Sequence, residues 1–259
     1  MLMKTLRYAV SVGAALVLCA CAGGRPAGSA ASHGGPAAAA PGKEASAAAP
    51  RPATQQVVGL DWYDLFDGKT LRNWKITQFG GHGTPTVTDG VLIIPMPAGG
   101  DMSGVTWAGP PLPKYNYEIS LDAKRIDGGD FFLGLTFPVG DSHASLILGG
   151  WGGSVCGISC LDFEDASRNE TTTTHEFKKD QWYSVRVRVF REGIQAFLDD
   201  EKIVDVNTKG RKVDVRMECE PCKPLGIATW NTAGAYRSIR MRLLTEDEIK
   251  TAPARRDWD

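Results

Sequence analysis

Residues 182–190 read Trp-Tyr-Ser-Val-Arg-Val-Arg-Val-Phe, and this stretch decides the fold class. Apolar and polar residues alternate strictly along it, with the valines on one side and the arginines on the other. A period of two is typical of a β-strand with one buried face. Polar turns at residues 191–193 and 199–202 separate it from two further strand patterns, at 194–198 and 203–206. The whole segment therefore predicts an antiparallel meander.

Similar patterns extend from this meander in both directions. Residues 117–123 and 238–243 alternate in the same way, whereas 131–137 and 144–148 are more continuously apolar, as is typical of central strands. Helical features first appear at residues 245–249, where a threonine cap precedes an acidic turn. We therefore predict an all-β fold, a two-sheet antiparallel sandwich or jelly roll over residues 57–245, followed by a short helix or tail over 246–259.

Residues 1–21 are typical of a bacterial lipoprotein signal peptide. Two basic residues precede an apolar run over residues 8–20, which is shorter than the roughly 20 apolar residues of a membrane span. Leu18 lies three positions before Cys21, and the small residue Ala20 lies directly before it. This pattern predicts lipidation of Cys21, with a plain secretory signal as the alternative.

Residues 22–56 consist mainly of Ala, Pro, Gly and Ser and predict a disordered linker. We expect an exported protein that is anchored to the bacterial cell envelope, in the outer membrane or the periplasm, through its N-terminal lipid alone. The formal net charge is −1, so the composition gives no sign of a nucleic-acid partner.

Four cysteines follow the signal segment: Cys156, Cys160, Cys219 and Cys222. An even number in an exported protein favours disulfides, although the spacing also fits a four-thiolate zinc site. An extended strand would place Cys156 and Cys160 roughly 13 Å apart. We therefore expect bonds between the loop after Trp151 and the turn at Cys219 and Cys222.

Several segments resemble the 3-keto-disaccharide hydrolase domain family. Residues 65–71 (Leu-Phe-Asp-Gly-Lys-Thr-Leu), followed by Trp74 and Lys75, are similar to its opening motif, and residues 89–92 fit its next strand. The closing meander is also similar to laminin-G-like and other concanavalin A-like sandwiches. The resemblance covers about residues 60–244. It implies two curved sheets, a sugar site on the concave face and cleavage of sugars already oxidised to a ketone at C3.

The chain departs from that family at residues 129–135. Many members carry Asn-Ser-Gly followed by Arg at this place, where this chain reads Gly-Asp-Phe-Phe-Leu-Gly-Leu. The segments that distinguish this chain are instead residues 149–153 and the acidic loop of residues 162–172, and we look for binding residues mainly there.

Trp151 has two glycines on each side, which leave its ring free to stack on a sugar; a core position for the ring is the alternative. In the acidic loop, Asp162, Asn169 and Glu170 are candidate substrate-binding residues. The oxygen atoms of this loop also suit calcium, although the spacing is not that of an EF-hand, and no other cofactor is expected. His82, in a glycine-rich loop, is a candidate for the border of a cleft.

The expected chemistry follows from the substrate class that the resemblance implies. A ketone at C3 acidifies the proton at C2, so a base that removes this proton starts an elimination that breaks the C1–O bond, and water addition completes hydrolysis. Candidate bases are Glu118, Asp165 and His143. Glu118 belongs to a polar row whose sheet face the sequence leaves open.

We predict an enzyme, a 3-keto-glycoside hydrolase or lyase with a carbohydrate substrate. The Gly-x-Ser-x-Gly elbow of many serine hydrolases does not occur in the sequence, which argues against a serine triad. The alternative is a lectin-like module that holds glycan at the envelope without cleaving it. A purely structural envelope protein is a third interpretation.

Overall fold

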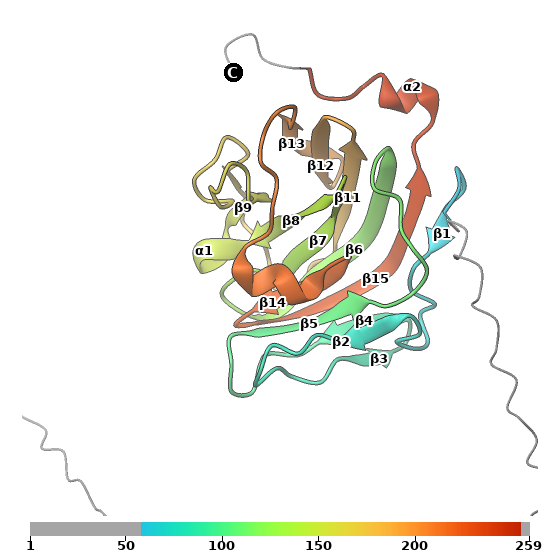
Figure 1. Cartoon of the computed structure of the whole chain (residues 1–259). Helices are drawn as coiled ribbons and strands as arrows, with labels where there is room; N and C mark the ends of the chain where they lie inside the picture. The colour runs from blue at the N-terminus through green and yellow to red at the C-terminus, as the bar shows by residue number, and fades with distance from the viewer. Residues whose placement is uncertain (1–57, 255–259) are drawn as a thin grey trace, which may run out of the picture. The chain divides into compact units, whose positions relative to one another are not determined.

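The computed structural model describes residues 58–254, which form two antiparallel β-sheets packed face to face (Figure 1). The predicted two-sheet sandwich is therefore confirmed. The predicted signal peptide, the lipidation site at Cys21 and the linker over residues 22–56 lie outside the described residues.

The first sheet has eight strands and contains the predicted meander. Its order is β13-β12-β11-β6-β15-β4-β3, and β1 also pairs with β15. The strands predicted at 117–123, 182–190, 194–198, 203–206 and 238–243 each fall on one of its members. The strands are β1 (Tyr63–Asp64), β3 (Thr86–Thr88), β4 (Val91–Ile94), β6 (Tyr117–Gly128), β11 (Tyr183–Phe190), β12 (Gly193–Leu198), β13 (Glu201–Asn207) and β15 (Thr232–Leu243).

The second sheet has seven strands in the order β10-β9-β8-β7-β14-β5-β2. The apolar stretches predicted as central strands fall on β7 and β8, which pair with each other inside this sheet. The strands are β2 (Trp74–Ile76), β5 (Met102–Trp107), β7 (Leu133–Val139), β8 (Ser142–Gly149), β9 (Val155–Ser159), β10 (Thr173–Thr174) and β14 (Gly226–Trp230).

The main core lies between the two sheets, and alternation along each strand defines its two faces. Ile119 and Leu121 of β6 are fully buried in one cluster with Leu146 and Leu148 of β8. Because successive side chains of a strand point to opposite sides, the intervening residues lie on the outer face of each sheet. The sandwich therefore offers two outer faces on which a functional site can be built.

The outer face of the seven-stranded sheet carries small residues. Gly104, Ala228 and Gly134 lie side by side across β5, β14 and β7. Beside this row, the short helix η1 (Met217–Cys222) packs on β5 and β14 over Thr106 and Gly226 (Figure 1). A Cβ at Gly226 would lie 2.7 Å from the Cβ of Cys222, so this close approach requires glycine. A second apolar cluster, which includes Met102, Phe131, Ile147, Cys219 and Cys222, fills the space beneath.

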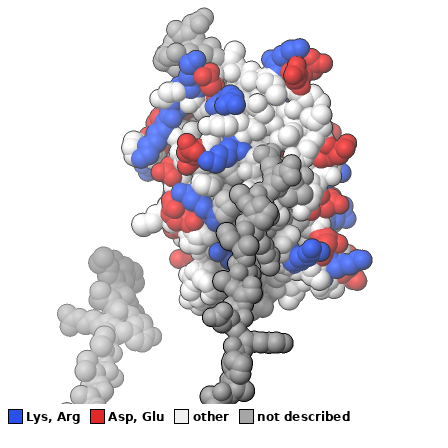
Figure 2. Space-filling model, turned by 45° about the vertical axis from the view of Figure 1, so that its right-hand side comes forward, with Lys and Arg blue, Asp and Glu red and all other residues white. Residues whose placement is uncertain are grey.

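The outer face of the eight-stranded sheet carries long charged side chains, and the C-terminal segment covers part of it. This segment begins with helix α2 (Glu246–Ile249), where Thr245 and Glu248 form a reciprocal capping box. The short helix predicted at this place is therefore confirmed. On the face of the molecule seen in Figure 2, basic and acidic side chains alternate rather than gather by sign. Within residues 58–254, no helix has the length and apolar character that a membrane crossing requires.

Candidate functional site

A cavity of about 180 Å3 lies on the outer face of the seven-stranded sheet, beside η1. Large apolar side chains form most of its wall, and three charged side chains reach into it. The rings of Phe131 and Trp230 lie 6.3 Å apart in a tilted arrangement on one side. The lining residues are Met102, Asp130, Phe131, Ile147, Trp151, Ser159, Arg216, Glu218, Cys219 and Trp230.

Trp151 projects from a tight turn, labelled α1 (Gly150–Gly153), that joins β8 to β9. The residue is 42 % exposed, so the ring is not part of the core. Its backbone has φ 48° and ψ 55°, the left-handed region that costs a residue with a Cβ about 1–2 kcal/mol.

Two side chains from neighbouring elements hold the Trp151 turn in place. Arg125 of β6 donates from Nη2 to the carbonyl oxygens of Gly153, at 2.9 Å, and Gly149, at 3.5 Å. Asp130 accepts a longer hydrogen bond from the backbone N–H of Gly152, at 3.3 Å, and a shorter one from that of Phe131, at 2.7 Å. Asp130 therefore both lines the cavity and supports the aromatic residue beside it.

Arg216 and Glu218 form the charged side of the cavity. Arg216 donates from Nη2 to Glu218 Oε1 at 3.1 Å and from Nη1 to Asp165 Oδ2 at 3.0 Å. The hydrogen bond with Arg216 lowers the pKa of Glu218 below its ordinary value, and the same bond raises the pKa of Arg216. Both side chains stay accessible, with 40 % of Arg216 and 35 % of Glu218 exposed. At neutral pH the cavity therefore offers an ionised carboxylate and a cation to a ligand.

Of the residues predicted in the acidic loop, Asp165 lies nearest to this chemistry, because it contacts Arg216 behind the cavity wall. Asn169 braces the loop instead: its Nδ2 donates to the carbonyl oxygens of Ile158, at 2.8 Å, and Asp165, at 2.9 Å. Asp162 and Glu170 both pair with Arg211, away from the cavity lining. Among residues 58–254, no three His, Cys, Asp or Glu side chains come close enough together to hold a metal ion. Calcium binding by the acidic loop stays a prediction.

The two predicted histidines lie outside the cavity beside Trp151. His143 lines a separate hollow with Lys114 and Pro138. Burial, followed by the charge of Lys223, lowers the pKa of His143. His82 is half-buried in its loop, and its Nδ1 is buried without a hydrogen-bond partner among the described residues.

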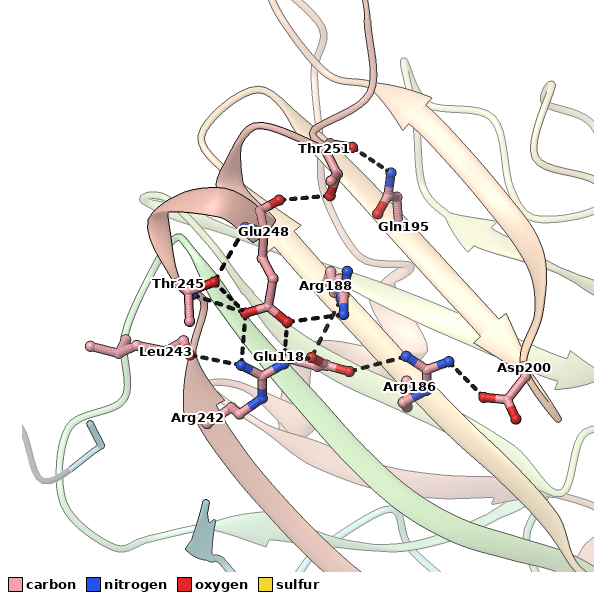
Figure 3. A network of polar contacts seen from close by, with 10 residues as sticks. All are labelled: Glu118, Arg186, Arg188, Gln195, Asp200, Arg242, Leu243, Thr245, Glu248 and Thr251. Atoms are coloured by element: carbon pink, nitrogen blue, oxygen red, sulfur yellow. Dashed lines mark hydrogen bonds and ion pairs between the residues drawn. The ribbon is translucent and has the colours of Figure 1, made fainter. Parts of the chain in front are cut away.

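Glu118 lies on the opposite side of the sandwich, on the outer face of the eight-stranded sheet (Figure 3). Its side chain is only 2 % exposed and contacts three arginines: Arg186 at 3.4 Å, Arg188 at 3.4 Å and Arg242 at 2.5 Å. Glu248 of α2 closes the cluster through Arg188 and Arg242. The structure therefore does not bring Glu118 together with Trp151 or with the acidic loop.

The four cysteines are free thiols in the structure. Cys156 packs in the main core between the sheets, whereas Cys219 and Cys222 pack in the second cluster on the other side of β9 and its neighbours. In this arrangement the core of one sheet separates Cys156 from the Cys219–Cys222 turn. Cys160, which is half-buried beside Ser159, is the cysteine on the loop after Trp151 that stays available to that turn. Oxidation of the exported protein stays a prediction.

Of the residues that line the cavity, sequence reasoning identified only Trp151 as a binding residue, and it missed Asp130, Arg216, Glu218 and Trp230 among the others. They come from three segments, around residues 130, 216–218 and 230, and only the order β7-β14-β5 together with the η1 crossing brings them to one place. One feature of the sequence pointed to this face of the sheet: Gly104, Gly134 and Gly226 interrupt otherwise apolar strands. Glycines inside strands often mark the close approach of another chain segment.

Comparison with known proteins identifies the family. The model of the 3-keto-alpha-glucoside-1,2-lyase-like domain matches residues 61–242. No curated protein matches the chain. Among solved structures, the apo Crh5 transglycosylase is 10 % identical, with 78 % of this chain and 90 % of that chain covered and a TM-score of 0.49.

Two further solved structures are similarly distant. A glycosyl hydrolase family protein from Mycobacterium fortuitum is 13 % identical, with 71 % of this chain and 100 % of that chain covered and a TM-score of 0.40. The carbohydrate binding module CBM66 from Bacillus subtilis is 11 % identical, with coverages of 66 % and 95 % and a TM-score of 0.39. Identities and scores this low give no information about the residues of the site.

Proposed function

Because the chain belongs to the 3-keto-alpha-glucoside-1,2-lyase-like domain family, we propose that it cleaves 3-keto-glycosides in the cavity beside Trp151. One observation carries the proposal: an exposed tryptophan, an accessible carboxylate and an accessible guanidinium line the same cavity. The apolar face of a pyranose can stack on Trp151, and Arg216 and Glu218 then lie where a base and a cation are needed.

The reaction uses Glu218 as the base and Arg216 as the cation. Glu218 takes the proton from C2, and the electron pair moves onto the C3 oxygen, whose developing negative charge Arg216 stabilises. When the enolate collapses, the C1–O bond breaks and C1=C2 forms. The proton held by Glu218 returns to the leaving oxygen, and water added across the double bond completes net hydrolysis.

Glu218 suits this role better than the three bases expected from sequence. It lines the cavity beside Trp151, and it is accessible to a ligand. Glu118 is sealed by three arginines, Asp165 lies behind Arg216 and His143 lies in another hollow. Asp130 is the second carboxylate of the cavity, and we assign it to the binding of sugar hydroxyls.

The experiment is incubation of the purified protein with a 3-keto-disaccharide and measurement of the released 3-keto-hexose. Glu218→Gln keeps the shape and removes the base, so turnover should fall by about 10²–10⁴-fold. Glu192→Gln is the matched control, because Glu192 forms an exposed pair with Lys209 on a distant turn. Full activity in Glu218→Gln would reject this assignment.

A non-catalytic lectin-like module is the second candidate, and one observation favours it. Both carboxylates of the cavity are already engaged, Glu218 by Arg216 and Asp130 by two backbone N–H groups. A site that only binds needs no free base. Absence of turnover in the wild-type protein, together with binding of a disaccharide measured by calorimetry, would favour this alternative.

Export and lipid anchoring complete the proposal and rest on residues 1–21. The test is metabolic labelling with a radioactive fatty acid in a bacterial host. Cys21→Ala should abolish the label, whereas Cys19→Ala, two residues away, should keep it. Label that survives Cys21→Ala would contradict lipidation at this position.

A further inference from the structure

The short helix η1 carries two of the four cysteines, Cys219 and Cys222, and both are buried. In a 3-10 helix, side chains three residues apart lie on the same face, and their Cα atoms are about 6 Å apart. A disulfide needs a Cα separation of about 4.4–6.8 Å. The regular geometry of η1 therefore places these two residues within bonding range of each other.

The side chains beneath η1 bring the two sulfur atoms together as well. The Ser145 hydroxyl lies against the thiol of Cys219, and the Thr136 hydroxyl lies against that of Cys222. These two hydroxyl oxygens are 2.9 Å apart, on paired residues of β8 and β7. Both cysteines belong to the same apolar cluster. The two thiols are therefore neighbours on one small area of the sheet.

The other pairings are less favourable. Cys156 lies in the main core, and β9 is an extended strand after it, so Cys156 and Cys160 are roughly 10 Å or more apart. Cys160 lies at the end of β9, two strands away from β7, on which Cys222 packs. Neighbouring strands are about 4.8 Å apart, so Cys160 and Cys222 are separated by roughly 10 Å. Among the described cysteines, the remaining rival is a bond from Cys160 to Cys219.

We propose that Cys219 and Cys222 bond to each other when the chain folds under oxidising conditions, and that this bond fixes η1 on the sheet. Thr106 donates from Oγ1 to the carbonyl oxygen of Pro221 at 2.9 Å, and Pro221 removes one backbone donor inside the helix. A helix of six residues with an internal proline has few hydrogen bonds of its own, so a covalent link adds rigidity. Because Glu218 directly precedes Cys219, the bond also fixes the backbone of the proposed base, although the bond itself is independent of the proposed function.

The oxidation is a thiol–disulfide exchange with a disulfide-bonded oxidant. One cysteine, as the thiolate, attacks a sulfur of the oxidant and forms a mixed disulfide, and the other half of the oxidant leaves as a thiolate. The second cysteine then loses its proton and attacks the first, which releases the second half. The pair loses two protons and two electrons, and the oxidant becomes two thiols. Burial raises the pKa of the Cys219 thiol to about 11, so the folded protein reacts slowly and we expect the bond to form before η1 packs on the sheet.

Peptide mapping tests the pairing. The purified full chain is refolded with a mixture of reduced and oxidised glutathione, blocked with iodoacetamide and digested with trypsin. Lys223 precedes a proline, so trypsin leaves Cys219 and Cys222 in one peptide, residues 217–237. We expect this peptide to be two hydrogen atoms lighter than its dithiol form and to stay separate from the peptide of the other two cysteines, residues 126–168. Iodoacetamide or glutathione on peptide 217–237, or its linkage to peptide 126–168, overturns the proposal.

Two variants connect the bond to stability. The measured quantity is the melting temperature after refolding with the glutathione mixture minus that after refolding in excess reduced thiol. This difference should be about 4–8 °C in the wild-type protein, because the bond closes only a short loop. Cys222→Ser should abolish the difference, and Cys160→Ser, the matched control, should keep it. The reverse pattern would identify the rival bond to Cys160 and overturn the proposal.

Amide hydrogen exchange measures the effect on the cavity and needs no turnover. Residues 216–222 should exchange faster in the protein refolded in reduced thiol than in the oxidised protein, whereas residues 184–190 on the other sheet should not change. A chain that turns over no 3-keto-disaccharide would reject the proposed function and leave the mapped bond unaffected. Equal exchange of residues 216–222 in both forms would show that the bond does not fix η1.

Discussion

The two outer faces of the sandwich each carry a carboxylate in contact with arginine, yet their surroundings differ. On the eight-stranded sheet, Glu118 is 2 % exposed and contacts three arginines beneath the C-terminal segment (Figure 3). On the seven-stranded sheet, Glu218 is 35 % exposed and shares one arginine that is itself 40 % exposed. The first carboxylate is fully engaged by protein partners, and the second remains open to a ligand.

The difference follows from the side chains that each strand presents outward. Long arginines from β11 and β15 fill the face around Glu118, and Phe197 packs under two of them at 4.6 and 5.6 Å. The other face carries the small residues Gly104, Ala228 and Gly134; η1 packs beside them over Gly226, and a cavity stays open at its edge. The presence of a carboxylate on an outer face therefore does not identify a functional site. The burial of the carboxylate and its partners distinguish a structural role from a functional one.

The largest effect is expected for Glu118→Gln. This change leaves three partly buried arginines without their central counter-charge, which typically costs about 3–5 kcal/mol of the free energy of unfolding. Urea denaturation measures it. Asp200→Asn is the control, because Asp200 pairs with the same Arg186 but is 90 % exposed, and it should change stability by less than about 1 kcal/mol. Equal stability of the two variants would remove the contrast between the faces.

A smaller effect, with a defined pH dependence, is expected for Glu248→Gln. The hydrogen bond from Arg242 holds the pKa of Glu248 at about 2, below its ordinary 4.5. A carboxyl group with a depressed pKa stabilises the fold fully above its unfolded pKa and loses that contribution as pH falls through the folded pKa. Bonds of this kind contribute about 1.5–3 kcal/mol at neutral pH.

The measurement for Glu248 is the stability difference between wild type and variant from pH 7 to pH 2. The difference should be constant down to about pH 4.5 and should shrink between about 4.5 and 2. A difference that stays constant over this whole window would show that Glu248 acts through packing and not through its charge.

On the cavity face, Trp151→Ala should weaken sugar binding by about tenfold, or about 1.4 kcal/mol, with little change in stability. The ring is exposed, so its removal creates no core cavity. Calorimetric titration and thermal melting measure the two quantities. Trp62→Ala is the control on the other face, where the exposed Trp62 stacks on Arg240 at 4.5 Å. A loss of about 3–5 kcal/mol of stability in Trp151→Ala would instead identify a core residue.

The smallest expected effect is a gain in stability. Trp151→Gly removes the same ring as Trp151→Ala but also relieves the left-handed backbone strain, and part of that gain is offset by the greater freedom of glycine in the unfolded chain. Trp151→Gly should therefore be about 0.5–1 kcal/mol more stable than Trp151→Ala, with equally weak binding. Equal stability would show that the turn is not strained.

The sequence sufficed for the fold because strand periodicity is a local signal. The alternation of residues 182–190 predicted β11, with its valines buried, and the threonine cap at residue 245 predicted α2. It also singled out Trp151, because the flanking glycines are adjacent in the chain.

The rest of the site could not be predicted, because its residues meet only through the sheet order. Glu218 lies two residues after Arg216 and directly before Cys219, and no sequence pattern there marks a base. Asp130 follows a strand, in the segment that departs from the family. Alternation along the strand assigns Glu118 to the same face as the other polar residues of that strand. It does not identify the three arginines that seal Glu118.

The central claim is that ligand binds on the outer face of the seven-stranded sheet and not on that of the eight-stranded sheet. Amide hydrogen exchange of the Glu218→Gln protein, with and without saturating 3-keto-disaccharide, tests it most directly. We predict slower exchange in residues 149–155 and 214–222 and unchanged exchange in residues 184–190. Protection confined to residues 184–190 and 240–248, around Glu118, would contradict the account.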